Sequence, residues 1–341
     1  MRFVAAALVL CTHATFYYHE RIDAAIQVWH FGEVGVPIFF VISGIVMVVA
    51  TQSLPNDGAG ARLFMLRRVV RIVPLWWAAL SIKVFVSLVR PDAVNHNFFQ
   101  IDHALKSYFF IPYFNEQHAV EPLHGVGWTL LHEMFFYTLF SLAMWLGLRP
   151  GVTASATIVG LCFAGKLVAL DSPFWSVATS PANLYFVVGM VVGSVMVRGP
   201  GWRRIRWGAT ASLALLTVVL ASLPSRWGVH HSIPVALAVA VCILLWSRSA
   251  MPQPLAALGR LGNSSYSLYL FHPFVAPAAL LALGRVMPGI DAWLHITAAV
   301  LFTVLVAHLL HLWLEVPVVR WARDRLMQPI QTSKQSGAQT A

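Results

Sequence analysis

Charged residues are scarce in this sequence, and their scarcity restricts the class of protein. Only 11% of the 341 residues are charged, whereas a soluble globular chain averages about 25%. By contrast, 58% of the residues are hydrophobic, and the mean hydropathy is +0.72. This balance excludes an ordinary soluble domain. It predicts an all-α, polytopic membrane protein whose lipid-facing helices account for the apolar excess.

Cysteine is rare as well, with three residues that all fall in apolar runs: Cys11, Cys162 and Cys242. Neither a disulfide framework nor a cysteine-based metal site is indicated, and we expect no metal. The sequence shows no internal repeat and no matched pair of broken helices, which many transporters use. The first apolar run has a basic start like a signal peptide but no small-residue cleavage site, so we expect it to stay as an anchor.

Apolar runs long enough, or nearly long enough, to span a bilayer number about ten. They cover approximately residues 3–18, 34–51, 72–89, 127–147, 152–170, 181–197, 206–223, 232–247, 264–286 and 291–314. With both termini in the cytoplasm, 16 Lys and Arg residues fall on the cytoplasmic side and 5 on the opposite side, as the positive-inside rule requires. We therefore predict one transmembrane domain over 1–325, followed by a disordered cytoplasmic tail at 326–341.

His13 is the residue around which we interpret the rest of the chain. It lies eleven residues after Arg2 in the first apolar run, which places it about 16 Å along a helix and near the middle of a bilayer core of roughly 30 Å. An ionisable side chain at that depth is costly and indicates a function. The alternative is a packed histidine that forms a hydrogen bond with a neighbouring helix.

Two further titratable side chains project to a similar depth. Glu133 follows Gly127 by six residues, about 9 Å along a helix, and His272 lies about 12 Å into the run that starts at 264. Three costly groups at one level favour a polar cavity. A carboxylate beside His13 would fix its tautomer and strengthen it as a base, although Glu133 could instead pair with another buried polar group.

The densest basic stretch is FMLRRVVRIVPLWW at 64–77. Arg68 and Arg71 are three residues apart and share a helix face. Guanidinium groups bind phosphate in a bidentate manner. A cytoplasmic phosphorylated ligand would suit Arg67, Arg68 and Arg71. The alternative is that these charges set the topology or contact lipid headgroups.

Other histidines carry weaker signals. The loop from about 90 to 126 contains His96, His103, His118 and His124 with no metal-ligand spacing, which favours a solvated loop over a lid on an acceptor site. His308 and His311 lie one turn apart in the last run. Because no facing carboxylate is apparent, we interpret them as packing or interhelical hydrogen bonds.

Five motifs in order resemble the acyltransferase-3 family of integral membrane O-acyltransferases, most closely the branch that acetylates bacterial exopolysaccharides. They are Arg2 with His13, the run GVPIFFVISG at 35–44, Arg68 and Arg71 followed by Pro74, Leu75 and Trp76, the stretch from Gly127 to Tyr137 with Glu133, and SYSLYLFHP at 265–273. Each motif alone is weak, whereas the ordered set covers about residues 1–320.

The resemblance implies acyl-CoA, usually acetyl-CoA, as the donor and a sugar hydroxyl of a polysaccharide or lipid-linked glycan as the acceptor. It implies that His13 is essential, together with Arg2, Arg68 and Arg71, and we expect substrate contacts from Trp128, Tyr137 and His272. Two positions depart from the pattern. Many relatives carry Asp where this chain has Pro37, for which Glu33 is the available substitute, and His132 stands where relatives often have an aromatic or polar residue.

We therefore predict an O-acetyltransferase of the bacterial inner membrane that moves an acyl group from cytoplasmic acyl-CoA to an exported polysaccharide. His13 would be the general base, Glu133 would orient it, and Arg2, Arg67, Arg68 and Arg71 would bind the donor. We expect no nucleic-acid partner. Two alternatives stay open: a proton-coupled exporter of a polysaccharide precursor, and a non-catalytic partner of a polysaccharide synthase.

Overall fold

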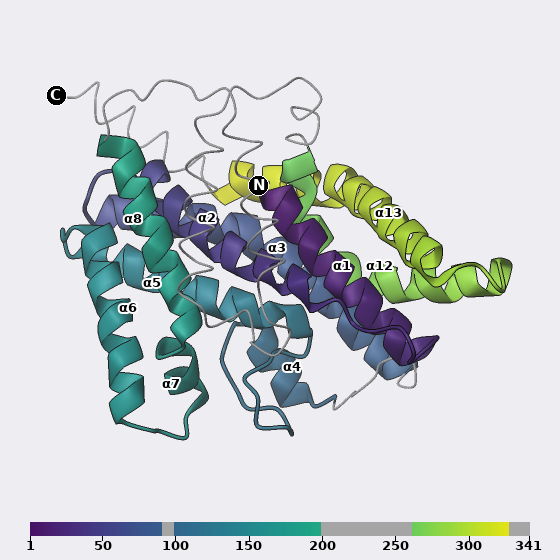
Figure 1. Ribbon diagram of the computed structural model, residues 1–341. Coiled ribbons are helices and arrows are strands. Elements are labelled where there is room, and N and C mark those ends of the chain that lie inside the picture. The colour runs from purple at the N-terminus through teal and green to yellow at the C-terminus, as the bar shows by residue number, and fades with distance from the viewer. Residues whose placement is uncertain (91–98, 199–260, 327–341) are drawn as a thin grey trace. The chain divides into compact units, whose positions relative to one another are not determined.

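The computed structural model describes residues 1–90, 99–198 and 261–326 (Figure 1). Within these ranges the regular structure is helical, apart from one isolated antiparallel bridge between Phe114 and Val120. The prediction of an all-α protein is confirmed for the described residues. The predicted runs at 206–223 and 232–247, and all but the first residue of the predicted tail at 326–341, lie outside them.

Six described helical segments are long and apolar enough to cross a membrane: His30–Ala50, Gly58–Val89, Pro150–Leu167, Pro173–Val197, Gly262–Val286 and Ala292–Leu326. Large apolar side chains stay exposed along them, such as Phe85 and Phe163, which suits helices that face lipid. The chain is thus a membrane protein. The count of ten spans and the cytoplasmic placement of the termini stay predictions.

The helices that carry His13 and Glu133 are not among these six segments. They are α1 (Arg2–Arg21) and α5 (Trp128–Trp145). Both were predicted as spans, and both are helical over the predicted runs. Their buried polar side chains make them less apolar than the six, as expected for helices whose polar groups face protein rather than lipid.

The chain forms two compact units, which are described separately. Among the described residues, unit 1 comprises 1–52, 154–170, 178–198 and 261–309. Unit 2 comprises 53–90, 99–153, 171–177 and 310–326.

In unit 1, α1 packs against α2 (Gly35–Ala50) and α12 (Ser265–Val286), and α2 packs against α8 (Leu184–Arg198) (Figure 1). Ala6 and Leu10 of α1 share an apolar cluster with Leu268 of α12, and small side chains allow this close approach. Unit 1 also holds η4 (Pro181–Asn183), η6 (Gly262–Ser264), most of α6 (Pro150–Leu167) and most of α13 (Ala292–Leu310).

Gly44 lies at a close contact between α2 and α8. A Cβ atom at Gly44 would collide with the carbonyl oxygen of Phe186 and would lie 2.9 Å from the Cα of Gly189. The stacked rings of Phe40 and Phe186, 4.4 Å apart, extend the same contact. The backbones of α2 and α8 therefore approach closely at Gly44.

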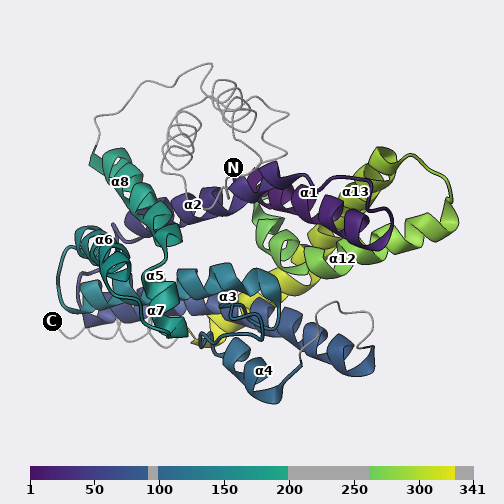
Figure 2. The same cartoon turned by 60° about the horizontal axis from the view of Figure 1, so that its bottom comes forward.

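In unit 2, the long helix α3 (Gly58–Val89) runs beside α5 (Figure 2). The predicted span began at 72, but the helix begins at Gly58, where the Asp57 carboxylate accepts a hydrogen bond from the amide of Gly60 at 2.8 Å. This capping geometry starts a helix, and arginines continue it as well as apolar residues do. Its 32 residues reach about 48 Å, so α3 is longer than a bilayer core.

The described part of the segment between α3 and α5, residues 99–127, is partly packed and partly exposed, so the interpretation of a solvated loop fits only some of its histidines. It contains α4 (Ile101–Tyr108) and the turn η3 (Gly125–Gly127). The Trp76 indole donates to the carbonyl of Ser107 at 2.9 Å, and His124 is buried 5.8 Å from the Trp76 ring. Burial raises the pKa of Tyr113 in this segment. His118 is exposed and pairs with Asp171 at 2.9 Å, and His96 lies outside the described residues.

The last described turns also differ from the prediction. At η7 (His311–Glu315) the helix takes π geometry, and His311 Nδ1 forms a hydrogen bond with Glu315 at 2.9 Å. The interpretation that His311 lacks a carboxylate partner is therefore wrong. A spacing of four residues within one helix supplies the partner.

Candidate active site

His13 has a defined hydrogen-bond role in unit 1. Its Nδ1 lies 2.9 Å from the carbonyl oxygen of Val9, one turn earlier in α1. Because a carbonyl oxygen only accepts, Nδ1 must carry the proton and donate it. The neutral imidazole then holds its lone pair on Nε2. A single backbone contact thus leaves Nε2 as the nitrogen that can accept a proton.

His272, predicted at a similar depth, lies next to His13. The two ring centroids are 4.9 Å apart with planes tilted by 59°. His272 is fully buried in α12, and its Nδ1 donates to the carbonyl of Leu268 at 3.2 Å. Pro273 follows directly, and α12 continues through it. Unit 1 therefore brings two imidazoles together from the first and fifth motifs.

The second motif, the run at 35–44, is linked to the histidine pair through aromatic contacts. Phe39 of α2 lies 5.4 Å from the ring of Tyr269, and Tyr269 lies 6.0 Å from the ring of His272. Tyr17 contacts His13 from the next turn of α1 at 6.1 Å. Aromatic rings thus border the histidine pair, and aromatic edges pack favourably against such rings.

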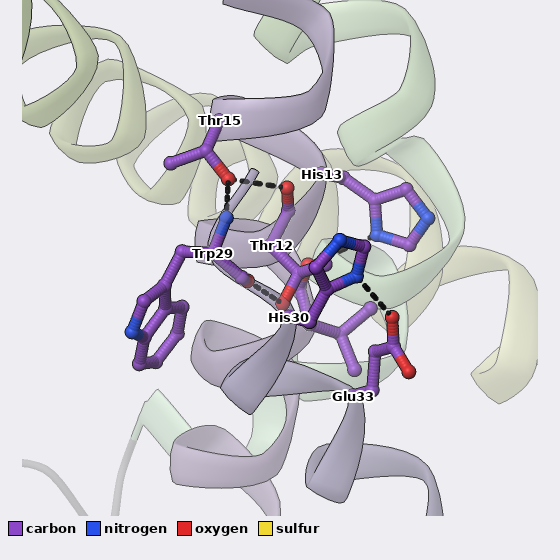
Figure 3. A network of polar contacts seen from close by, with 7 residues as sticks. Thr12, His13, Thr15, Trp29, His30 and Glu33 are labelled. Carbon is purple, nitrogen blue, oxygen red and sulfur yellow. Dashed lines mark hydrogen bonds and ion pairs between the residues drawn. The ribbon is translucent and has the colours of Figure 1, made fainter. Parts of the chain in front are cut away.

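A turn that precedes α2 is fastened to α1 around His13 (Figure 3). Thr12 donates to the carbonyl of Trp29 at 2.8 Å, and the Trp29 amide donates to Thr15 at 2.9 Å. The hydroxyl of Thr15 also donates to the carbonyl of Thr12 at 2.8 Å. These bonds lie on both sides of His13 along the helix and fix the turn against it.

This turn also carries a carboxylate. In η1 (His30–Val34), His30 Nδ1 lies 2.9 Å from the Glu33 carboxylate. The sequence suggested Glu33 only as a substitute for a missing carboxylate. Its contact with His30 follows from a spacing of three residues, which is a weak signal by itself.

The arginines of the third motif take different environments in unit 2. Arg68 is only 8% exposed, and its guanidinium lies 5.5 Å from the ring of Phe64 and 5.9 Å from that of Tyr137. Arg67 is exposed and Arg71 is half-buried. Arg67 and Arg71 are one and three residues from Arg68 on α3, and Glu133 is on α5 in the same unit. Unit 2 thus combines three cations with the predicted carboxylate.

The third and fourth motifs meet in unit 2 at a glycine. A Cβ atom at Gly127 would collide with the Trp76 ring, so only glycine fits where α5 begins. Trp128 is half-buried and lies 5.7 Å from the His132 ring, edge to face. Tyr137 is buried against Phe64 and Arg68. The predicted substrate residues Trp128 and Tyr137 therefore lie on one helix in different surroundings.

The predicted site residues thus separate into two groups. Unit 1 holds His13, His272 and Arg2, and Arg2 is the first residue of α1. Unit 2 holds Arg67, Arg68, Arg71, Trp128, Glu133 and Tyr137. His13 and His272, which were predicted to lie at a similar depth, are in contact, and the pairing of His13 with Glu133 stays a prediction. No group of three or more potential metal ligands occurs among residues 1–90, 99–198 and 261–326.

The described residues thus form a helical membrane protein with a pair of histidines in unit 1 and three arginines close together in unit 2. The profile of the acyltransferase domain matches residues 1–312, so the chain belongs to this acyltransferase family. The prediction of an O-acyltransferase enzyme is thereby confirmed. The exopolysaccharide production protein ExoZ of Rhizobium meliloti (strain 1021) is 30% identical over 307 residues, which cover 86% of this chain and 92% of that protein. No solved structure matches the chain significantly.

Proposed function

We propose that this enzyme transfers an acyl group, acetyl in the simplest case, from acyl-CoA to a hydroxyl group of an exopolysaccharide or its lipid-linked precursor. The observation that carries this proposal is the His13 imidazole, whose Nδ1–H is engaged by Val9 and whose Nε2 is the basic nitrogen. The name of the similar protein from Rhizobium meliloti supports an exopolysaccharide acceptor. The enzyme would act in the bacterial inner membrane, with both termini and its donor site on the cytoplasmic side.

The chemistry assigned to His13 is proton transfer. Nε2 takes the proton of the acceptor hydroxyl as its oxygen attacks the thioester carbonyl carbon. A C–O bond forms, the C–S bond breaks, and the thiolate of CoA takes up the proton from the imidazolium. A thioester is already activated, so a base and correct positioning supply what the reaction needs.

The arginines of unit 2 are the proposed donor site. Arg67, Arg68 and Arg71 interact electrostatically as like charges, so a polyphosphate such as that of CoA would relieve their repulsion. Exposed Arg67 and half-buried Arg71 are one turn apart and could bind phosphate. Buried Arg68 adds a third positive charge on the same helix. Arg2 is proposed to assist, and Trp128 and Tyr137 are proposed to contact substrate. Glu133 is proposed to orient the His13 base.

A direct test is thioester cleavage by purified protein in detergent. Acetyl-CoA alone should release little free CoA, and addition of the polysaccharide should accelerate the release while the glycan gains acetyl groups by mass spectrometry. If a cooperative unfolding transition shows that the protein is folded, the absence of both CoA release and glycan acetylation would contradict the proposal.

Proton-coupled export of the polysaccharide precursor is a second candidate activity of this enzyme, beside acyl transfer, and one observation favours it. His13 and His272 lie 4.9 Å apart between ring centroids, a separation that suits a proton relay as well as a base and its neighbour. Proteoliposomes separate the two functions, because an exporter would move the glycan in response to a pH gradient without any acyl-CoA.

A further inference from the structure

The last two residues of α4 fasten this helix to α3 in unit 2 (Figure 2). The Trp76 indole donates to the carbonyl of Ser107 at 2.9 Å. The Trp77 indole donates to the carbonyl of Tyr108 at 2.9 Å, and the Tyr108 hydroxyl lies 2.7 Å from that of Ser81. These bonds fix α4 at one level along a helix that is long and apolar enough to span a membrane.

A second face of α4 is apolar and exposed. Ile101, Leu105 and Phe109 follow one another at intervals of four residues, with exposed fractions of 71%, 55% and 64%. Phe109 comes directly after the helix, and its amide still donates to the carbonyl of Leu105. Because residues four apart lie on the same side of a helix, the three side chains form one apolar stripe. A contiguous exposed apolar surface indicates contact with a membrane or with another protein.

A third face of α4 is charged. Lys106 Nζ lies 2.9 Å from the Asp102 carboxylate, and both side chains reach the surface. The hydrogen bond from Lys106 holds the pKa of Asp102 below its usual value, so this carboxylate is ionised at neutral pH. An ionised group is costly in hydrocarbon. Each residue turns the helix by roughly 100°, so the charged pair lies beside the apolar stripe and outside it.

The neighbouring surface of α3 identifies the bilayer as the partner of the apolar stripe. On and beyond the turn that binds α4, α3 exposes the large apolar side chains of Trp77, Ile82, Phe85 and Leu88. Such side chains on a membrane-spanning helix suit contact with lipid. Trp77 and Tyr108, which join the two helices, are residue types that concentrate where a membrane meets water. The stripe therefore belongs to a helix that is bonded to a lipid-facing helix.

We propose that α4 is an interfacial helix, whose apolar stripe lies at the edge of the hydrocarbon layer while Asp102 and Lys106 face water and lipid headgroups. A helix with one apolar side and one charged side binds in the plane of the membrane interface in this way. The partner is the lipid bilayer and not a second protein, since the stripe adjoins a helix that faces lipid. This contact is independent of the acyl-transfer chemistry.

The anchoring of α4 extends to the start of α5. The Ser107 hydroxyl accepts a hydrogen bond from the amide of Leu123 at 2.9 Å. The Trp76 indole that binds the Ser107 carbonyl also packs 5.8 Å from the His124 ring. The same indole leaves no space for a Cβ atom at Gly127. Helix α4 thus connects the membrane surface to the turn from which α5 begins.

The test is photo-crosslinking of the full-length protein in isolated membranes, with benzoylphenylalanine in place of Leu105. Mass spectrometry of the intact protein should show a phospholipid adduct, as it should with the same probe in place of Phe85 on α3. Asp102, on the charged face of the same helix, is the matched control, and the probe there should give several-fold less lipid adduct. Ile101 provides a second site on the apolar stripe if the Leu105 variant fails to fold.

Two results would overturn the proposal. One is a probe at Leu105 or Ile101 that joins a second copy of the chain or another protein instead of lipid. The other is a yield of lipid adduct on the apolar stripe that is no higher than the yield at Asp102. The adduct at Phe85 verifies that the probe reacts with lipid, so a missing adduct on the stripe counts against the proposal.

Discussion

Replacing Arg68 with Met separates a structural role of this buried cation from donor binding. Its guanidinium lies 5.5 Å from the Phe64 ring and 5.9 Å from the Tyr137 ring. A cation–π contact contributes about 0.5–1 kcal/mol when exposed and about 2 kcal/mol when desolvated, so two contacts give roughly 1–4 kcal/mol. Relief of repulsion from neighbouring arginines returns only about 0.2–0.5 kcal/mol for each pair.

We therefore expect Arg68→Met to lower the free energy of unfolding by about 1–3 kcal/mol, since Met fills the space but carries no charge. The measurement is the unfolding midpoint of purified protein in detergent. Arg67→Met is the matched control: its exposed side chain should leave the midpoint unchanged but raise the KM for acetyl-CoA through the loss of a charge-assisted phosphate contact. An Arg68→Met protein that unfolds at the wild-type temperature would refute this reasoning.

Two further predictions concern packing and topology. Gly44→Val should destabilise the α2–α8 contact and lower the unfolding midpoint by several degrees, whereas Gly160→Ala should be neutral or slightly stabilising, because nothing lies within 4 Å of a Cβ atom there. A Gly44→Val protein as stable as the wild type would contradict the close approach. Single cysteines at exposed Asp57 and Glu116 should react with an impermeant reagent from opposite sides of the membrane, and reaction of both from one side would contradict the predicted topology.

Periodicity and composition predicted the helices well because each helix depends on its own residues. The run at 3–18 became α1, and the run at 264–286 became α12. The proximity of His13 and His272 followed the same logic, since two ionisable side chains at one membrane depth are expected to share a polar cavity. The start of α3 at Gly58 was missed because arginines end an apolar run without ending a helix.

The attachment of the turn at 29–33 to α1 could not be predicted from the sequence. It depends on backbone hydrogen bonds from Trp29 to Thr12 and Thr15, and such contacts across a turn leave no periodic pattern. Gly32 was an available signal, because a glycine often marks a place where one backbone segment packs closely against another. Burial of Arg68 was missed for a related reason: an arginine in a basic stretch looks like its exposed neighbour Arg67 until the rings of Phe64 and Tyr137 are placed.

The central claim is that His13 is the base for acyl transfer, and His13→Gln tests it most directly. Glutamine keeps a hydrogen-bonding side chain but cannot accept the hydroxyl proton, so acceptor-dependent release of CoA should fall at least ~100-fold. Binding of acetyl-CoA should persist, because the proposed phosphate site is on the arginines of unit 2. His19→Gln, on the same helix with its ring bonded to the carbonyl of Ile26, should retain wild-type transfer. Transfer by His13→Gln at a rate near that of the wild type would contradict the account.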